Sequence, residues 1–185
     1  FKKSYKQTIG LDFFIKRLML PGKVDAAVQI WDIGGQSIGS KMIGNYIYGA
    51  DAILLCYDIT NYQSFQNLED WFRLVRRTFP KSKLPYTALV GNKTDLHHIR
   101  TVPRDKHDNF ADENDLYSFF VSAKNAENVK SCFHRITADL AGVVLSGPEM
   151  QIAHQVVKAE IIEHERDDPN VVTAAPPPKA NCVIQ

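Results

Sequence analysis

The stretch Tyr86–Asp95, YTALVGNKTD, decides the fold, and the rest of the chain is best understood by working outward from it. Its apolar start, Tyr86–Val90, predicts a strand buried on both faces, with Gly91 as a hinge before the polar loop Asn92–Asp95. The flanking segments alternate between apolar runs and helical spacing: Ala52–Tyr57, Ser64–Arg77, Arg104–Glu113, Tyr117–Val121 and Val129–Leu145. This alternation predicts an α/β fold, a doubly wound and mostly parallel sheet with flanking helices and right-handed crossovers.

Two further regions complete the domain plan. Residues 11–20 and Val24–Trp31, joined by Pro21-Gly22, predict a β-hairpin. Residues 146–185 change in composition: a short helix over Glu149–Glu163 is possible, and beyond it charges, small residues and prolines predict a flexible tail. We therefore expect one domain over residues 1–145 and a tail over 146–185.

Composition excludes several classes of function. The 185 residues are 44% hydrophobic and carry a net charge of +1, with no basic stripe, which argues against nucleic acid as a partner. No segment approaches the ~18 apolar residues of a membrane span, and no signal peptide is visible. Cys56 and Cys132 are expected in the core of a protein in a reducing compartment, which predicts a cytosolic location unless something anchors the chain.

The loop Asn92–Asp95 has the chemistry to recognise one base. An aspartate carboxylate accepts two parallel hydrogen bonds, and guanine offers two neighbouring donors, its ring N–H and its exocyclic amine. Adenine offers no such pair, so a buried Asp95 would discriminate between the purines. Asn92 could bridge the base and the loop, and the stem of Lys93 could lie against the base plane. In Ser122-Ala123-Lys124, a small residue lets an N–H reach a base carbonyl, and the lysine can cover the base.

A second group of residues suits phosphate and magnesium. Asp32, in Trp31–Gln36 (WDIGGQ), can hold a magnesium ion, Gly35 lets a backbone N–H approach a phosphate, and Gln36 could orient an attacking water. The hydroxyl of Thr8 can also bind magnesium. Taken singly, the first motif could be an ordinary glycine-rich turn at a strand end, and Thr8 an ordinary loop residue.

Together these motifs, in this order, resemble the Ras superfamily of small GTPases over about the first 145 residues. Within it the chain resembles a Rab: Thr8–Phe13 (TIGLDF) is similar to the Rab switch I, and Tyr46–Ala50 (YIYGA) to the segment after switch II. Phe13, Trp31 and Tyr46 match a surface aromatic triad that Rab partners contact, although core aromatics would have the same pattern.

The resemblance implies a role for each residue. Thr8 would bind magnesium and sense the γ-phosphate, Asp32 would hold magnesium through water, Gly35 would contact the γ-phosphate, and Gln36 would position the water. The guanine readers would be Asn92, Lys93, Asp95, Ser122, Ala123 and Lys124. Phe1 would pack against the base, and Tyr5 would close over the phosphates.

The same resemblance implies how the protein works with others. Catalysis would be positioning and charge stabilisation. Without an arginine supplied in cis, hydrolysis of GTP would be slow until a GTPase-activating protein binds. A guanine-nucleotide exchange factor and effectors would be the other partners of a monomer.

Two departures from the Rab pattern stand out. Ile33-Gly34 replaces the usual Thr-Ala, and Ser37-Ile38-Gly39 replaces the charged start of switch II. These glycines predict an unusually mobile segment and an altered partner surface.

The chain contains no Gly-x-x-x-x-Gly-Lys-Ser/Thr phosphate-binding loop, and it begins with Phe1. The family's order places that loop upstream of Phe1, so we expect the sequence to be a fragment lacking a central strand, the loop and the first helix. Strands ending near Trp31 and Tyr57 would then lack ladder partners, and an unpaired buried group costs roughly 1–3 kcal/mol. Residues 1–185 alone should fold poorly and bind GTP weakly.

The terminal Cys182-Val183-Ile184-Gln185 has the form of a prenylation motif, and glutamine in the last place favours a farnesyl group on Cys182. One such chain gives only reversible membrane binding, so a prenyl-binding carrier is an expected partner.

Two functions remain open from sequence: a GTP-hydrolysing switch, or a nucleotide-free binding module that presents the switch surface to partners. A dinucleotide enzyme is excluded because the chain has no Gly-x-Gly-x-x-Gly.

Overall fold

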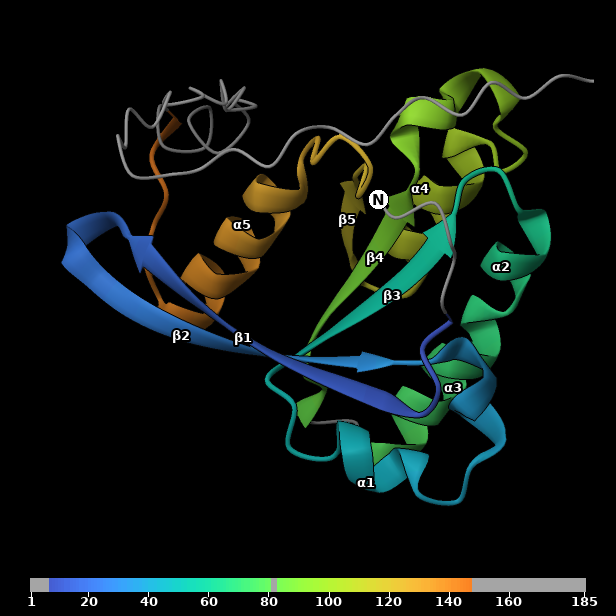
Figure 1. Ribbon diagram of the computed structural model, residues 1–185, viewed down its shortest axis with the longest axis horizontal. Coiled ribbons are helices and arrows are strands. Elements are labelled where there is room, and N and C mark those ends of the chain that lie inside the picture. Colours follow the sequence, from blue (N-terminus) through green and yellow to red (C-terminus); the bar gives the residue numbers. More distant parts are fainter. Residues whose placement is uncertain (1–6, 81–82, 148–185) are drawn as a thin grey trace, which may run out of the picture.

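The computed structural model describes residues 7–80 and 83–147, in which strands and helices alternate (Figure 1). The strands are β1 (Leu11–Leu20), β2 (Val24–Ile33), β3 (Ala52–Asp58), β4 (Tyr86–Asn92) and β5 (Tyr117–Phe120). The α-helices are α1 (Ile43–Ile47), α2 (Tyr62–Gln66), α3 (Leu68–Thr78), α4 (Arg104–Glu113) and α5 (Val129–Ala141). Shorter 3-10 segments cover Pro21–Lys23, Gly35–Gly39 and Thr94–Ile99. Phe1, Tyr5, Cys182 and all but residues 146–147 of the expected tail lie outside the described residues.

The predicted hairpin is confirmed. β1 and β2 pair antiparallel from Leu11↔Ile33 to Leu20↔Val24, so β2 is two residues longer than predicted. The turn between them contains Gly22 at φ 74°, a left-handed conformation that glycine adopts without steric cost.

The parallel part of the fold is the sheet β3-β4-β5. β3 pairs with β4 from Ala52↔Tyr86 to Asp58↔Asn92, and β4 pairs with β5 from Ala88↔Tyr117 to Gly91↔Phe120. Within the described ranges β2 and β3 share no ladder, so the hairpin and the parallel sheet are separate sheets. The α/β class is confirmed, and β2 and β3, the two strands expected to lack ladder partners, share none within the described residues.

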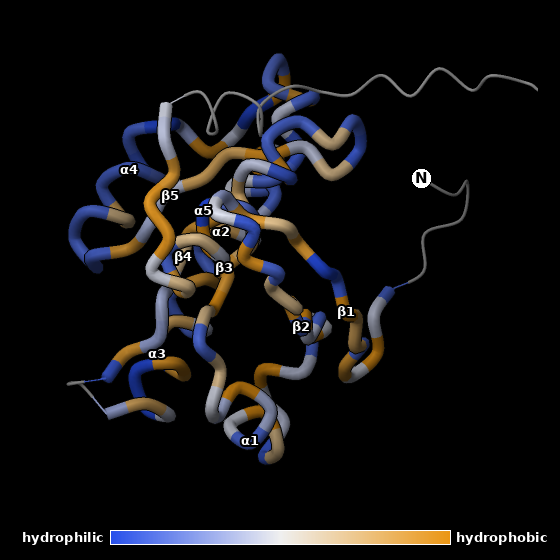
Figure 2. The backbone as a smooth tube through the Cα atoms, turned by 90° about the vertical axis from the view of Figure 1, so that its left-hand side faces the viewer, coloured by the Kyte–Doolittle hydropathy of each residue, from blue (hydrophilic) through white to orange (hydrophobic). Residues whose placement is uncertain are grey.

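Helices cover both faces of the parallel sheet, as the doubly wound prediction requires. One apolar cluster joins Leu55, Ile59 and Leu89 of the sheet region to Leu68 and Phe72 of α3. On the opposite face, Ala88 and Val90 pack with Cys132 and Ile136 of α5. Figure 2 shows the hydrophobic residues concentrated along β3, β4 and β5, while α4 is mostly hydrophilic.

Cys132 is buried as predicted, but the prediction for Cys56 was wrong, because its side chain is exposed. Successive residues of a strand face opposite sides, and Leu55 and Tyr57 occupy the buried side on either side of it. Ala52 and Leu54 share the face of Cys56 and are partly buried against the cluster that includes Cys132 and Ile136, but Cys56, nearer the carboxyl end of β3, is not part of that cluster.

The helix predicted over Ser64–Arg77 is two helices that meet at Asn67, and α1 was not predicted. The helix predicted over Val129–Leu145 ends earlier because Gly142 adopts φ 67°. Its N–H, with that of Val143, bonds back to the last turn in the usual glycine stop. Among the helices in the described part of the chain, none is long and apolar enough to cross a bilayer.

Candidate functional site

The site lies at the carboxyl ends of the parallel strands, where ligands of such sheets bind. The last residues of β3 and β4, Asp58 and Asn92, are register partners, and Ile59 N–H donates to the Asn92 carbonyl at 3.1 Å. β4 and β5 are also register partners up to Gly91↔Phe120, so the loops that follow these two strands start next to each other at the carboxyl-terminal end of the sheet.

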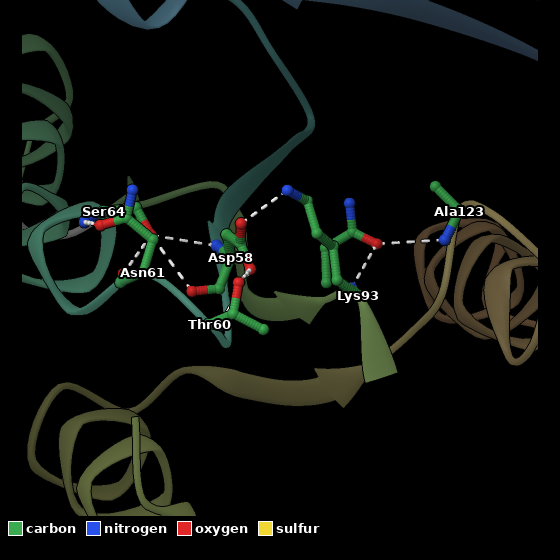
Figure 3. Close-up of polar contacts among 7 residues, drawn as sticks. Asp58, Thr60, Asn61, Ser64, Lys93 and Ala123 are labelled. Atoms are coloured by element: carbon green, nitrogen blue, oxygen red, sulfur yellow. Dashed lines mark hydrogen bonds and ion pairs between the residues drawn. The ribbon is translucent and has the colours of Figure 1, made fainter. Parts of the chain in front are cut away.

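Asn92 fastens these two loops together. Its Oδ1 accepts from the backbone N–H of Lys93 at 2.7 Å and from that of Ala123 at 3.0 Å. Asn92 was predicted to bridge the base and the loop; its contacts with the two loops are seen here, and its contact with the base stays a prediction. The N–H of Ala123, expected to face a base carbonyl, is instead donated to Asn92. Figure 3 shows Ala123 approaching this loop from one side.

Asp95, which is predicted to read the base, has two polar side-chain partners. Its Oδ1 accepts from the Ser122 hydroxyl at 2.6 Å, and its Oδ2 lies 3.7 Å from Nζ of Lys124. The Asp95 side chain is 14% exposed, and Ser122 is fully buried. The Ser122 hydroxyl, against some desolvation and with help from Lys124, lowers the pKa of Asp95, so it is a carboxylate at neutral pH.

Thr94 adds a second fastening that the sequence reasoning missed. Its N–H donates to the Val121 carbonyl at 3.1 Å, and its hydroxyl donates to Oε2 of Glu127 at 2.9 Å. The Glu127 carbonyl in turn accepts from the Ser122 N–H at 3.0 Å. Glu127 thus contacts both the loop after β4 and the loop after β5. No signal in the sequence indicated that Thr94 pairs with Glu127, because the two residues are 33 positions apart.

Lys93 points away from the loop toward β3. Its Nζ lies 2.6 Å from Oδ2 of Asp58, and the Asp58 carboxylate also accepts from Thr60 (Figure 3). Asp58 is the other residue that sequence reasoning missed. A polar residue ending the strand next to β4 was the available signal, because parallel strands end at one edge.

The predicted magnesium residues also come together. The Thr8 hydroxyl donates to Oδ2 of Asp32 at 3.0 Å, and the Gly34 N–H donates to the Gly10 carbonyl at 3.0 Å. These two adjacent oxygen atoms, one of them from a carboxylate, suit magnesium as ligands. Magnesium prefers oxygen ligands and completes its coordination shell with water and phosphate. In the described residues no cluster of three or more His, Cys, Asp or Glu side chains forms a separate metal site.

Gly35 and Gln36 follow directly after this contact, at the start of the 3-10 segment Gly35–Gly39. Both residues are exposed, so the Gln36 amide is accessible to a water. The predicted mobility of this segment stays a prediction.

The predicted aromatic triad is partly assembled. Phe13 and Trp31 face each other across the hairpin with ring centroids 5.1 Å apart in an edge-to-face arrangement. They are 47% and 51% exposed, so they are not core aromatics. Tyr46 lies on α1, where its hydroxyl contacts Sδ of Met42 at 3.9 Å.

Comparison with known proteins agrees with this geometry. Residues 1–141 match the model of the Ras family. The chain is 42% identical to Ras-related protein Rab-28 of Caenorhabditis elegans over 167 residues, covering 90% of this chain and 67% of that protein. It is 38% identical to Ras-related protein RGP2 of Oryza sativa subsp. japonica over 144 residues, covering 78% of this chain and 65% of that protein. The chain thus spans about two thirds of the length of both relatives.

Proposed function

Because this chain belongs to the Ras family of small GTPases, and within it to the Rab type, we propose that the intact protein is a GTP- and GDP-dependent switch in membrane or vesicle traffic. The observation that carries the proposal is the base-reading arrangement of Asp95, which is held by Ser122 and Lys124 and stands beside the Asn92–Ala123 contact.

The Asp95 carboxylate has the capacity to read guanine. Two carboxylate oxygens offer about four acceptor positions, of which Ser122 uses one and Lys124 approaches another. The remaining positions suit the adjacent ring N–H and exocyclic amine of guanine. Adenine offers no such pair of donors, so it would leave these remaining acceptor positions of the largely buried carboxylate unsatisfied, which is costly.

The Thr8 and Asp32 oxygens would hold magnesium, which supplies charge stabilisation to the phosphates when it is bound. Gly35 would donate its N–H to the terminal phosphate, and Gln36 would orient the attacking water. Holding a water in line with its target lowers the barrier by positioning. None of these residues is a strong base, which supports slow hydrolysis until a GTPase-activating protein binds.

The exposed Phe13–Trp31 pair, with Tyr46, would be the surface that effectors contact. An exchange factor would act on the nucleotide-bound form. The same pair would equally serve a nucleotide-free binding module, which is the second candidate function. Hydrolysis and nucleotide binding distinguish the two.

Phosphate release from GTP and from ATP, measured with the full-length protein in magnesium buffer, tests the proposal. We expect phosphate release from GTP and none from ATP. Gln36→Leu should slow it at least about tenfold, because the water loses its orienting group. The matched control is Gln29→Leu, an exposed glutamine in β2. Tight binding of partners without any phosphate release or nucleotide binding would favour the binding module.

Membrane association is proposed to depend on a farnesyl group on Cys182. A prenyl-binding carrier would deliver the lipid-bearing protein to the membrane and extract it again. Cys182→Ser should move the protein from the membrane fraction to the soluble fraction of cells, while Cys56→Ser should not. Equal membrane fractions for Cys182→Ser and the unaltered protein would refute the lipid anchor.

A further inference from the structure

Lys93 and Asp58 form an ion pair between the ends of two neighbouring strands. Nζ of Lys93 lies 2.6 Å from Oδ2 of Asp58, with the two side chains 50% and 21% exposed. Asp58 ends β3, and Lys93 follows the last residue of β4. The lysine side chain therefore runs along the edge of the sheet from which the base-reading loops leave.

The Asp58 carboxylate is fixed in place by its own turn. Its Oδ1 accepts from the Thr60 N–H at 2.8 Å and from the Thr60 hydroxyl at 2.7 Å. Its backbone N–H donates to the Ser64 hydroxyl at 3.0 Å. One oxygen is thus committed to the turn, and the other is left to meet Lys93. Burial raises the pKa of Asp58, but the bonds from Lys93 and Thr60 outweigh it and hold that pKa below its usual value.

Lys93 is held at both ends. Its backbone adopts φ 70°, a left-handed conformation that is uncommon for a residue with a side chain. The Lys93 N–H is bonded to Asn92 Oδ1, and the Lys93 carbonyl accepts from the Leu96 N–H at 2.9 Å. With the ammonium held by Asp58, the four-carbon stem between these anchors loses most of its freedom.

We propose that Asp58 is a positioning residue for guanine-nucleotide binding, acting through Lys93: it holds the lysine stem stretched beside the base, so that the base meets an ordered apolar surface. The inference rests on the proposed function of the Asn92–Asp95 loop. A purely structural Asp58 would only close the turn to α2 through Thr60. The two roles use different carboxylate oxygens and can be separated.

Release of the fluorescent nucleotide mant-GDP from the full-length protein, with magnesium present, measures the effect. Asp58→Asn keeps an oxygen for both Thr60 bonds but removes the charge that holds Lys93. We expect release about fivefold faster, the upper range for a partly exposed ion pair. Thr60→Val, which removes a turn bond only, should stay within about twofold of the unaltered protein.

A double-mutant cycle with Lys93→Met tests whether Asp58 acts through the lysine. In the Lys93→Met background, Asp58→Asn should change the release rate less than about twofold. Asp58→Glu, which keeps the charge, should restore slower release than Asp58→Asn, and melting temperatures show that each variant is folded. A fivefold effect that persists in the Lys93→Met background overturns the inference, as does Asp58→Glu releasing as fast as Asp58→Asn.

The same experiment separates this inference from the proposed function. If the unaltered protein binds mant-GDP and excess ADP fails to displace it, the guanine site stands, and a wild-type rate for Asp58→Asn overturns only the role of Asp58. If ADP displaces mant-GDP as well as GDP does, the guanine site itself is wrong, and the role of Asp58 falls with it.

Discussion

At the scale of single residues, Gly34 governs how closely the two magnesium-side segments approach. A Cβ at Gly34 would lie 2.3 Å from the Thr8 carbonyl oxygen, which is shorter than real contacts allow. The same contact brings the Thr8 hydroxyl to Asp32 at 3.0 Å. The glycine that departs from the Rab pattern therefore permits this arrangement of Thr8 against the end of β2.

Gly34→Ala is expected to push the Thr8 segment away, break the Thr8–Asp32 bond and destabilise the fold by about 1–3 kcal/mol. Chemical denaturation measures the free energy of unfolding, and the magnesium dependence of mant-GDP release reports the site. Gly39→Ala is the matched control, because a Cβ there meets nothing within 4 Å. Equal stability and equal magnesium dependence for the two variants would disprove the role of Gly34.

At the scale of elements, His107 ties a helix to two strands. This α4 residue is fully buried, and its ring nitrogens meet the Tyr57 hydroxyl of β3 at 2.9 Å and the Ser118 hydroxyl of β5 at 2.7 Å. Burial is the main cause that lowers the pKa of His107 to about 4; Asp108 opposes the shift, and Arg100 and Arg104 add to it. The folded protein thus keeps this histidine neutral over a range in which the unfolded chain takes up a proton.

The resulting pH dependence has a definite sign. The stability that His107 contributes is fully present above the unfolded pKa of 6.5 and is lost as the pH falls toward about 4. At about 1.36 kcal/mol per pKa unit, the loss is about 3 kcal/mol. Denaturation of unaltered protein and His107→Gln at several pH values should show a shallower acid loss in the variant. His98→Gln, on the surface, should follow the unaltered curve; a parallel curve for His107→Gln would contradict the assignment.

A second contact between elements connects the loop after β4 to the segment before α5, because the Thr94 hydroxyl donates to Glu127 Oε2 at 2.9 Å. Thr94→Val removes the donor and should cost about 1–2 kcal/mol of stability, since the acceptor is charged. It should also speed mant-GDP release, because Glu127 holds Ser122 as well. Thr101→Val, at an exposed position, is the control. A Thr94→Val protein with unchanged stability and an unchanged rate of mant-GDP release would show that the Thr94–Glu127 bond is unimportant.

How much the sequence could predict depended on how local the deciding forces were. Tyr86–Val90 and Ala52–Tyr57 were predicted to within two residues, because strands buried on both faces are continuous apolar runs. α4 was predicted at its observed bounds. α1 was missed because five residues that include Gly44 are too short for a period to show.

The same distinction holds for the site. The meeting of Asn92 and Asp95 with Ser122 and Ala123 follows from the rule that parallel strands end at one edge. The partners of Lys93 and Thr94 were not predictable, because Asp58 and Glu127 are ordinary acidic residues whose pairing is fixed only by three-dimensional packing. Exposure of Cys56 was missed because an apolar run does not tell how far along the strand a helix covers each face of the sheet.

At the scale of the whole molecule, the site has two parts on separate sheets. Thr8 and Asp32 belong to the hairpin end, and the base-reading residues follow the parallel sheet. α5 contacts both strands of the hairpin and also packs on the parallel sheet through Cys132 and Ile136, so it connects the two. Under the proposed function, the specificity of the molecule for its nucleotide would depend on the loops that follow the parallel sheet, and above all on the Asp95 carboxylate.

Titration calorimetry of the full-length protein with GDP, ADP and xanthosine diphosphate tests this claim most directly. The account predicts a preference for GDP over ADP of at least about a thousandfold, because adenine lacks the pair of donors that would satisfy the remaining acceptor positions of Asp95. Asp95→Asn should lose that preference and favour xanthosine diphosphate, whose base carbonyl accepts from the new amide. Equal affinity of the unaltered protein for GDP and ADP would contradict the account.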